Sequence, residues 1–319
     1  MNLNNPWGCF IFEPFDTMNP ILALIITNII WGGASPIFKF ALQNIPPFTL
    51  AFIRFFLAGL IFLPIAIKNF EKISLRRWVE IFLVGFFGIF VNVAFFFLGL
   101  KKTESINVPI IASSGPVFIY FFSILFLKEK PRLKVFLGMM VALAGVFLII
   151  LSPIFLGREK MFLGEIEGNL LIVLATLGTV FSTIIGKDLL KKVNPYFVTA
   201  FSFLFSSVLF LLFVPQEIAN WSFSNLNLAG WVGIIYGVFF SSGAAYFLYY
   251  YGLSKIEAQE VGIFTYIDPI AAVLIAMPLL NEYPTIYYLI GSILVFGGIY
   301  LAEGRVHWHP VHKLKQKNF

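Results

Sequence analysis

The feature that most constrains this fold is a run of long apolar stretches. Ten segments of mostly apolar residues follow one another, separated by short polar or Pro/Gly-marked breaks. A helix that crosses a bilayer needs about 20 such residues. Transmembrane strands would instead show segments of about ten residues with alternating polarity, and that pattern is absent. The sequence therefore predicts an all-α integral membrane protein with ten transmembrane helices, at residues 20–40, 47–67, 77–98, 104–127, 132–151, 166–187, 195–214, 229–251, 257–280 and 285–302.

Composition excludes the soluble classes of protein. Apolar residues make up 59% of the chain and charged residues 12%, against roughly 45–50% and 25% in soluble domains. The single cysteine, Cys9, rules out a disulfide framework, and no Cys/His spacing indicates a metal site. The net charge is +6, but the basic residues lie in short runs between apolar segments, where they set membrane orientation and do not indicate nucleic-acid binding. The expected partner is the lipid bilayer, with no nucleic acid, cofactor or metal.

The distribution of Lys and Arg predicts how the chain is oriented. Cytoplasmic loops carry the excess of these residues. With the N-terminus inside, sixteen of them fall on the cytoplasmic side, and only Lys101, Lys102, Arg158 and Lys160 fall on the other side. We therefore expect a multi-pass protein of the cytoplasmic membrane with both termini in the cytoplasm.

The chain also repeats itself. A shift of 153 residues aligns residues 99–145 with 252–298 without a gap, and a shift of 148 extends the match upstream to Lys39 with Lys187. Each half then holds five helices, and an odd number places the halves in opposite orientations, as in many secondary transporters. The predicted organisation is a cytoplasmic segment at 1–19, five-helix repeats at 20–151 and 164–303, an extracytoplasmic connection at 152–163, and a basic cytoplasmic tail at 304–319. The aligned pairs include Gly99/Gly252, Pro116/Pro269, Glu129/Glu282, Gly138/Gly291 and Gly145/Gly298.

This skeleton resembles the EamA-type members of the drug/metabolite transporter superfamily. The resemblance covers roughly residues 20–303 and is carried by Trp31-Gly32, Pro36, Lys39, Arg54-Phe55, Pro116, Glu129, Gly138 and Gly145, repeated in part in the second half. It implies a metabolite carrier, often an exporter of amino acids or related compounds. It also implies a central cavity lined mainly by helices 3, 4, 8 and 9 and their neighbours.

Two charged residues near mid-membrane are the leading site candidates. Asp268 precedes Pro269 in the ninth apolar segment, and Arg54 lies in the second. Intramembrane charges are costly, and they commonly mark substrate or ion pathways. Two interpretations stay open. Asp268 faces a cavity, where it binds substrate or carries a proton, or it is held by Arg54 and stabilises the bundle.

Polar side chains of other segments complete the predicted site. Ser242 and Tyr246 share a face of a regular helix, Thr265 lies one turn from Asp268, and Asn92 is the polar residue at the edge of the equivalent face in helix 3. The predicted substrate-binding residues are therefore Asp268, Thr265, Tyr246, Ser242, Asn92 and Arg54. Tyr250 and Tyr251 are assigned to an interfacial aromatic belt, and Thr176, Thr179 and Thr183 to helix packing.

A third set of residues is predicted to be structural. Lys39 and Lys187 close the first helix of each half and reach the membrane interface. Glu129 and Glu282 precede Pro-marked helix starts and are expected to complement the positive helix ends. The remaining scaffold positions are the prolines Pro116 and Pro269 and the glycines Gly138, Gly145, Gly291 and Gly298, which let neighbouring helices approach closely.

Together these features favour a secondary transporter that moves a small metabolite by alternating access. No Walker-type Gly-x-x-x-x-Gly-Lys-Ser/Thr segment is present, so a gradient is the expected energy source. Two alternatives are an intramembrane enzyme and a passive channel. The first lacks clustered catalytic groups at depth, and the second lacks a repeated polar ring. We therefore expect no catalytic residues.

Overall fold

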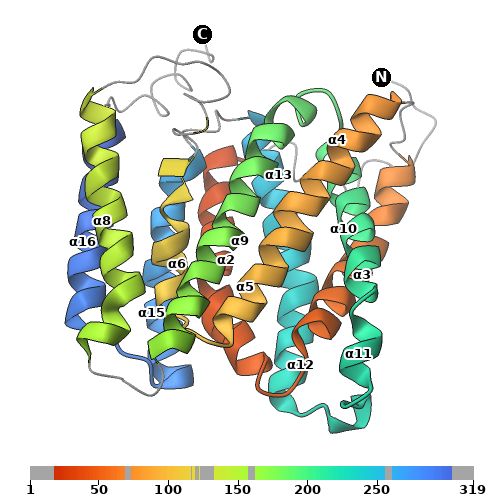
Figure 1. Ribbon diagram of the computed structural model, residues 1–319. Coiled ribbons are helices and arrows are strands. Elements are labelled where there is room, and N and C mark those ends of the chain that lie inside the picture. The colour runs from red at the N-terminus through yellow and green to blue at the C-terminus, as the bar shows by residue number, and fades with distance from the viewer. Residues whose placement is uncertain are drawn as a thin grey trace.

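The protein is a bundle of helices (Figure 1). The computed structural model describes residues 18–68, 73–115, 117–118, 122, 133–156, 162–255 and 261–303, and within these ranges the regular structure is helical throughout. The first half holds α2 (Pro20–Ala41), α3 (Pro47–Lys68), α4 (Leu75–Gly85), the π-helix η1 (Phe86–Val91), α5 (Asn92–Leu100), α6 (Asn107–Ala112) and α8 (Leu133–Phe155). The second half holds α9 (Phe162–Leu189), α10 (Pro195–Leu211), α11 (Val214–Ile218), the 3₁₀-helix η2 (Phe223–Asn225), α12 (Leu228–Ile235), the π-helix η3 (Tyr236–Ala244), α13 (Ala245–Lys255), the 3₁₀-helix η4 (Gly262–Tyr266), α15 (Ile267–Leu280) and α16 (Ile286–Glu303).

Local sequence explains where two of these helices begin. Asn19 and Asn194 each precede a proline at the first helical position. Each asparagine side chain accepts a hydrogen bond of 2.9 Å from a backbone N–H in the first turn. Proline is favoured there because its missing N–H would have no partner in the helix. These Asn-Pro pairs therefore fix the starts of α2 and α10.

The bundle is built to lie in lipid. Six helical segments are long and apolar enough to cross a membrane, at Pro20–Ala41, Pro47–Lys68, Leu75–Leu100, Phe136–Phe155, Gly164–Leu189 and Leu228–Lys255. Three further helical segments, at 195–211, 264–280 and 286–301, are apolar but shorter. Large apolar side chains also point outward, such as Ile293, which is 71% exposed. Lipid rather than water is the solvent that suits such a surface.

The helices pack as if the two halves were exchanged by a two-fold axis. The last helices of the halves, α8 and α16, pack together, and so do the second helices, α3 and α10 (Figure 1). The first helix of the first half, α2, packs on α13 and α15, while the first helix of the second half, α9, packs on α5 and α6. Each contact between a helix of the first half and a helix of the second therefore has a counterpart between the equivalent helices of the opposite halves.

The predicted glycines form the contact between α8 and α16. A Cβ added at Gly145 would lie 2.6 Å from the carbonyl oxygen of Gly291. One added at Gly298 would overlap the carbonyl oxygen of Gly138. The two helices thus cross at backbone contact, with each glycine of one half opposite a glycine of the other. Only residues without a side chain permit so close an approach.

The helix ends divide the basic residues unequally. In Figure 1, α2 begins and α16 ends at the upper end of the bundle, where α3, α9 and α13 also end. Among the described residues, the helix ends there carry Lys68, Arg76, Arg77, Lys187, Lys191, Lys192 and Lys255. The lower end, where α5 ends, carries Lys101 and Lys102 beside Lys39 of α2. The bundle therefore has one strongly basic end.

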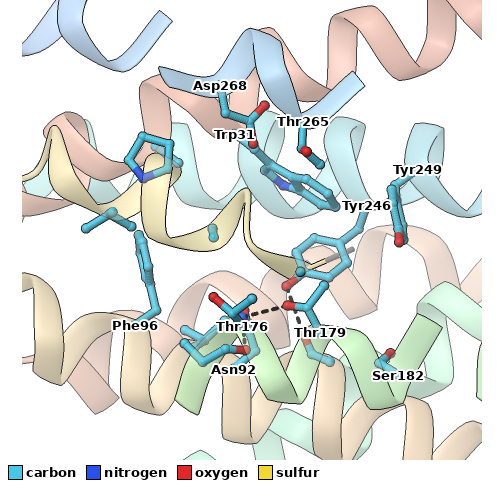
Figure 2. A pocket seen from close by; sticks show the side chains of 18 of the residues that line it. Trp31, Asn92, Phe96, Thr176, Thr179, Ser182, Tyr246, Tyr249, Thr265 and Asp268 are labelled. Carbon is cyan, nitrogen blue, oxygen red and sulfur yellow. Dashed lines mark hydrogen bonds between the residues drawn. The ribbon is translucent and has the colours of Figure 1, made fainter. Parts of the chain in front are cut away.

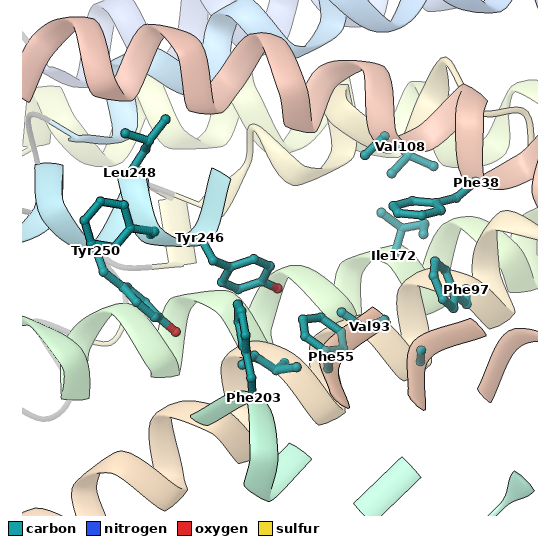
Figure 3. Close-up of a cluster of buried hydrophobic side chains, with 14 of the residues drawn as sticks. Phe38, Phe55, Val93, Phe97, Val108, Ile172, Phe203, Tyr246, Leu248 and Tyr250 are labelled. Carbon is teal, nitrogen blue, oxygen red and sulfur yellow. The ribbon is translucent and has the colours of Figure 1, made fainter. Parts of the chain in front are cut away.

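Aromatic side chains fill the core between α3, α5 and α10. Phe55 packs against Phe203 at 5.3 Å and Tyr246 at 5.8 Å between ring centroids, and Figure 3 shows this group with Phe38 and Phe97 nearby. Phe38, Phe55, Phe97 and Phe203 are all less than 2% exposed. This packing holds the middle of α3 in place, and with it the adjacent Arg54.

Candidate functional site

A cavity of about 220 Å³ lies between the two halves. Its wall comes from α2, α3, η1, α5 and α6 of the first half and from α9, η3, α13, η4 and α15 of the second (Figure 2). Five of the six predicted substrate-binding residues line it: Arg54, Asn92, Tyr246, Thr265 and Asp268. The structure therefore brings together side chains that are as far apart as 214 positions in the sequence.

Arg54 is held from several sides. Its Nε donates a 2.9 Å hydrogen bond to Oγ of Ser242, and its Nη2 donates one of 3.1 Å to Oγ of Ser241. The guanidinium carbon lies 4.5 Å from the ring centroids of both Phe38 and Phe55. Cation–π contacts of this kind stabilise a desolvated arginine. Arg54 is therefore a fixed positive charge in the cavity wall.

Ser242 is the one predicted binding residue that is not in the cavity wall. The prediction assumed a regular α-helix, in which residues 242 and 246 share a face. The segment Tyr236–Ala244 is a π-helix instead, and its wider turn, with i→i+5 hydrogen bonds, rotates its side chains away from the faces that they would have in an α-helix. Ser241 and Tyr246 therefore line the cavity, while Ser242 is fully buried and accepts the hydrogen bond from Arg54.

π-Helices occur at corresponding places in the two halves. The 153-residue shift maps η1, Phe86–Val91, onto residues 239–244, which lie inside η3. π-Helical segments are rare and are frequent at functional sites. Both are part of the cavity wall, through Gly88 and Ser241. This repetition was not predicted from the sequence, which shows only apolar helix there.

Asp268 lies where the ninth apolar segment changes its helical form. The segment is not one regular helix as predicted: the 3₁₀-helix η4 ends at Tyr266 and α15 starts at Ile267. Asp268 and Pro269 therefore stand in the first turn of α15, where proline is tolerated. The backbone of Asp268 packs closely on α2, because a Cβ at Gly32 would lie 2.5 Å from its carbonyl oxygen.

Among the residues that the structure describes, none pairs with the carboxylate of Asp268. Its Oδ1 is buried without a hydrogen bond, and among the described residues no ion pair joins it to Arg54 or to another cation. Of the two predicted interpretations, the geometry matches the one in which Asp268 faces the cavity. A buried carboxylate without a partner is costly, and such groups commonly have a functional role.

Aromatic rings form the wall beside Asp268. Trp31 lies 5.1 Å from both Tyr246 and Tyr249, between ring centroids. Its indole Nε1 donates a 3.2 Å hydrogen bond to the carbonyl oxygen of Ser241. Figure 2 shows Asp268, Trp31 and Thr265 at the same side of the cavity. Trp31 was recognised in the sequence only as part of the Trp-Gly motif, since a lone tryptophan gives no signal of depth.

The belt assignment of the neighbouring tyrosines is wrong. Tyr250 is 3% exposed and lines the cavity. Tyr251 is 7% exposed, and its hydroxyl donates a 2.9 Å hydrogen bond to the carbonyl oxygen of Met18. The reason is that α13 packs against α2 and α10, so these side chains face protein and not the lipid interface.

The opposite wall is polar. Asn92 donates hydrogen bonds from Nδ2 to the carbonyl oxygen of Ala175 at 2.9 Å and to Oγ1 of Thr179 at 2.8 Å. Thr176 and Thr183, which were assigned to packing, also line the cavity. The hydroxyls of Thr183 and Tyr249 lie 3.0 Å apart. The threonine stripe of α9 is thus part of the cavity wall.

The scaffold residues have more specific partners than the sequence indicated. Lys39 donates to the carbonyl oxygen of Thr103 at 2.6 Å and forms an ion pair of 2.7 Å with Glu282. Lys187 donates a 3.0 Å bond to the carbonyl oxygen of Leu253. Each lysine therefore ties the end of the first helix of its half to the end of the third. Pro116 and Glu129 lie outside the described residues.

Glu282 does not cap the helix that follows it. Its Oε2 accepts hydrogen bonds from the backbone N–H of Ser105 at 2.7 Å and of Ile106 at 3.3 Å, and from Oγ of Ser105 at 2.6 Å. These groups lie just before α6, in the other half. A carboxylate stabilises the free N–H groups at the start of a helix. Here that helix is α6, which is distant in the sequence and is brought to Glu282 by tertiary packing. Glu282 thus joins the two halves at the lower end of the bundle.

An all-helical bundle with membrane-length segments, two related halves and a cavity between them defines a class: the polytopic membrane transporters. Comparison with known families agrees. The model of the EamA-like transporter family matches residues 18–151 and again residues 166–303. The chain therefore belongs to the EamA-like transporter family, and it is a membrane transporter.

Individual relatives extend over the same length. The chain is 30% identical over 285 residues to an uncharacterized transporter of Archaeoglobus fulgidus, covering 89% of this chain and 99% of that protein. It is 26% identical to the uncharacterized transporter YetK of Bacillus subtilis, covering 89% and 87%. A solved crystal structure with 19% identity has a TM-score of 0.63, over 89% of this chain and 96% of the other. At that identity the likeness concerns the fold alone.

Proposed function

We propose that the protein is a secondary carrier that moves a small polar or amphipathic metabolite, such as an amino acid, by alternating access. In this proposal ten helices cross the cytoplasmic membrane in two inverted five-helix halves. Both termini lie in the cytoplasm, and export is the direction of net transport. The observation that carries the proposal is the cavity between the halves, whose wall holds Arg54 and Asp268, an acid that has no partner within the described part of the chain.

The packing of the halves supports alternating access. A carrier exposes its site to each side of the membrane in turn, by moving one repeat against the other. Here the contacts of α2 with α13 and α15 mirror those of α9 with α5 and α6. The ion pair of Lys39 with Glu282 fastens one end of the inter-half boundary. Its release would open that end while the other end closes.

Asp268 is the proposed coupling residue. A carboxylate that faces a cavity without a protein partner can take up and release a proton as the cavity changes sides. Arg54 has hydroxyl and aromatic partners and keeps its charge throughout the cycle. Protons are therefore the proposed driving ion, and Asp268 is the group that carries them.

The test is transport by the purified chain in vesicles. Labelled metabolites are screened with and without an imposed proton gradient, and protein-free vesicles serve as the control. The proposal predicts saturable flux of a small metabolite that responds to the gradient. Flux that rises linearly with concentration would indicate a channel instead, and chemical conversion of the metabolite would indicate an enzyme.

A further inference from the structure

The two charged groups of the cavity wall differ in how well the protein satisfies them. Arg54 has hydroxyl acceptors on two of its nitrogens and two aromatic rings 4.5 Å from its guanidinium carbon, and it is 2% exposed. Asp268 has no ion pair among the described residues, and its buried Oδ1 has no hydrogen bond. The described part of the cavity wall therefore stabilises the positive charge of Arg54 but offers no partner to the negative charge of Asp268.

The surroundings of Asp268 suit a cation. Trp31, Tyr246, Tyr249 and Tyr250 form a connected aromatic group in the wall, with neighbouring ring centroids 5.1 to 6.1 Å apart. Gly32, the next residue after Trp31, is in backbone contact with Asp268. The faces of tryptophan and tyrosine attract ammonium groups. An anion at this place would face the carboxylate and the negative ring faces together.

We infer that the substrate carries a protonated amine, which binds the carboxylate of Asp268 beside Trp31. The apolar part of the substrate lies against the tyrosines, and its polar groups reach Asn92 and Thr176 on the opposite wall. The inference rests on the proposed function, and it adds the chemical class of the substrate. A carboxylate on the substrate is accommodated by Arg54 but is not required.

Cavity size limits the rest of the molecule. The volume of about 220 Å³ is below the roughly 300–1,000 Å³ of sites that hold drug-sized ligands. A single aromatic ring or a short aliphatic chain with one amine is the largest substrate expected to fit. The inferred class therefore comprises monoamines and small amino acids.

Two matched series of compounds test the inference. The aromatic series is phenethylamine, phenylalanine and 3-phenylpropionate, and the aliphatic series is propylamine, 2-aminobutyrate and butyrate. Within each series the apolar body is kept: the first compound carries an amine alone, the second an amine and a carboxylate, and the third a carboxylate alone. Binding to the purified protein is measured by the shift in melting temperature, and by fluorescence compared with a Trp31→Phe variant. The amine and the amino acid are expected to bind, and the plain acid to bind at least tenfold more weakly.

Variants place the amine at Asp268. Asp268→Asn keeps the shape of the side chain and removes its charge, so amine binding is expected to weaken about 10- to 100-fold, as for loss of a charged hydrogen bond. Glu167→Gln makes the same chemical change at a side chain that is 57% exposed and outside the cavity wall, and it is expected to bind as the wild type does. If Asp268→Asn does not fold, the relative affinities of the wild-type protein for the amine, the amino acid and the acid still test the inferred substrate class.

The outcomes separate this inference from the proposed function. Acids that bind as well as their matching amines, or the absence of amine binding in both series, would overturn the substrate class. Saturable transport of acids alone would support the proposed carrier function and reject the inferred class of amine-bearing substrates. Amine binding that depends on Asp268, without any flux of a bound amine in vesicles, would keep the class and reject the carrier.

Discussion

Asp268 supplies a carboxylate that the protein leaves open to the cavity, so its chemistry is the most sensitive point of the account. We expect Asp268→Asn to abolish accumulation driven by a proton gradient while substrate exchange continues, because an amide cannot carry the proton. Exchange is measured in the same vesicles at substrate concentrations high enough to fill the weakened site. An Asn variant with wild-type gradient dependence would contradict the coupling role.

Arg54 makes a second prediction at the level of one side chain. Arg54→Lys keeps the charge but loses the planar fork that reaches both Ser241 and Ser242, and it loses the stacking on two rings. We expect a loss of stability of about 1–3 kcal/mol, measured as a lower melting temperature in detergent. Arg76→Lys is the matched control, since the Arg76 side chain is 83% exposed. Equal melting temperatures in the two variants would count against a structural role for Arg54.

Single residues also mark what the sequence could predict. The depth of Asp268 and Arg54 followed from their position in apolar segments, because a charge there needs a reason. Their partners did not follow, since Ser241, Ser242 and Phe38 reach Arg54 from other helices. Likewise Glu282 was recognised as a helix cap, but the helix that it caps belongs to the other half.

At the scale of one element, regular helical spacing was the assumption that failed. The segment 229–251 was predicted as a uniform helix, and its middle is the π-helix η3. Its residues, such as Val238, Phe239 and Phe240, are as apolar as those of a regular helix. A π-helix is fixed by packing and not by composition, so Ser242 was assigned to the cavity in place of Ser241. The predicted starts of α2 and α10, at residues 20 and 195, agree with those observed, since each has a local Asn-Pro signal.

The contact of α8 with α16 gives a prediction for whole elements. Gly145→Leu or Gly298→Leu would force a side chain into the backbone of the facing helix. We expect the free energy of unfolding to fall by more than the roughly 1–3 kcal/mol of ordinary overpacking, which is measured as less folded protein and a lower melting temperature. Gly297→Leu is the control, because nothing lies within 4 Å of a Cβ at that position. Normal yield with altered substrate preference in the Gly298 variant would refute the scaffold role.

At the scale of the whole molecule, the internal repeat was the most informative part of the sequence. It predicted two related halves, and the exchange-symmetric contacts of α2 and α9 have that form. The sequence did not predict which walls close the cavity. That depends on how the faces of several helices meet, and the meeting of Trp31 with Tyr246 and Tyr249 joins residues more than 200 positions apart.

Orientation in the membrane is tested by labelling. Asn225 ends the 3₁₀-helix η2 and Lys191 lies in the turn after α9; both are exposed, at opposite ends of the bundle (Figure 1). In a Cys9→Ser background, an impermeant thiol reagent added to intact cells is expected to label Asn225→Cys and not Lys191→Cys, because the basic end faces the cytoplasm. Labelling of Lys191→Cys alone would show that the molecule has the inverse orientation.

We propose that one cavity, lined by both halves, serves the two sides of the membrane in turn. Counterflow in vesicles tests it most directly. Vesicles that contain the purified protein are loaded with unlabelled substrate, and labelled substrate is added outside at low concentration without any ion gradient. For a carrier, the label is expected to rise inside above its outside concentration and then to decline. The rise occurs because unlabelled substrate occupies the site on the inside, so that few outward passages carry label. A simple approach to equal concentrations, without this transient rise, would contradict alternating access.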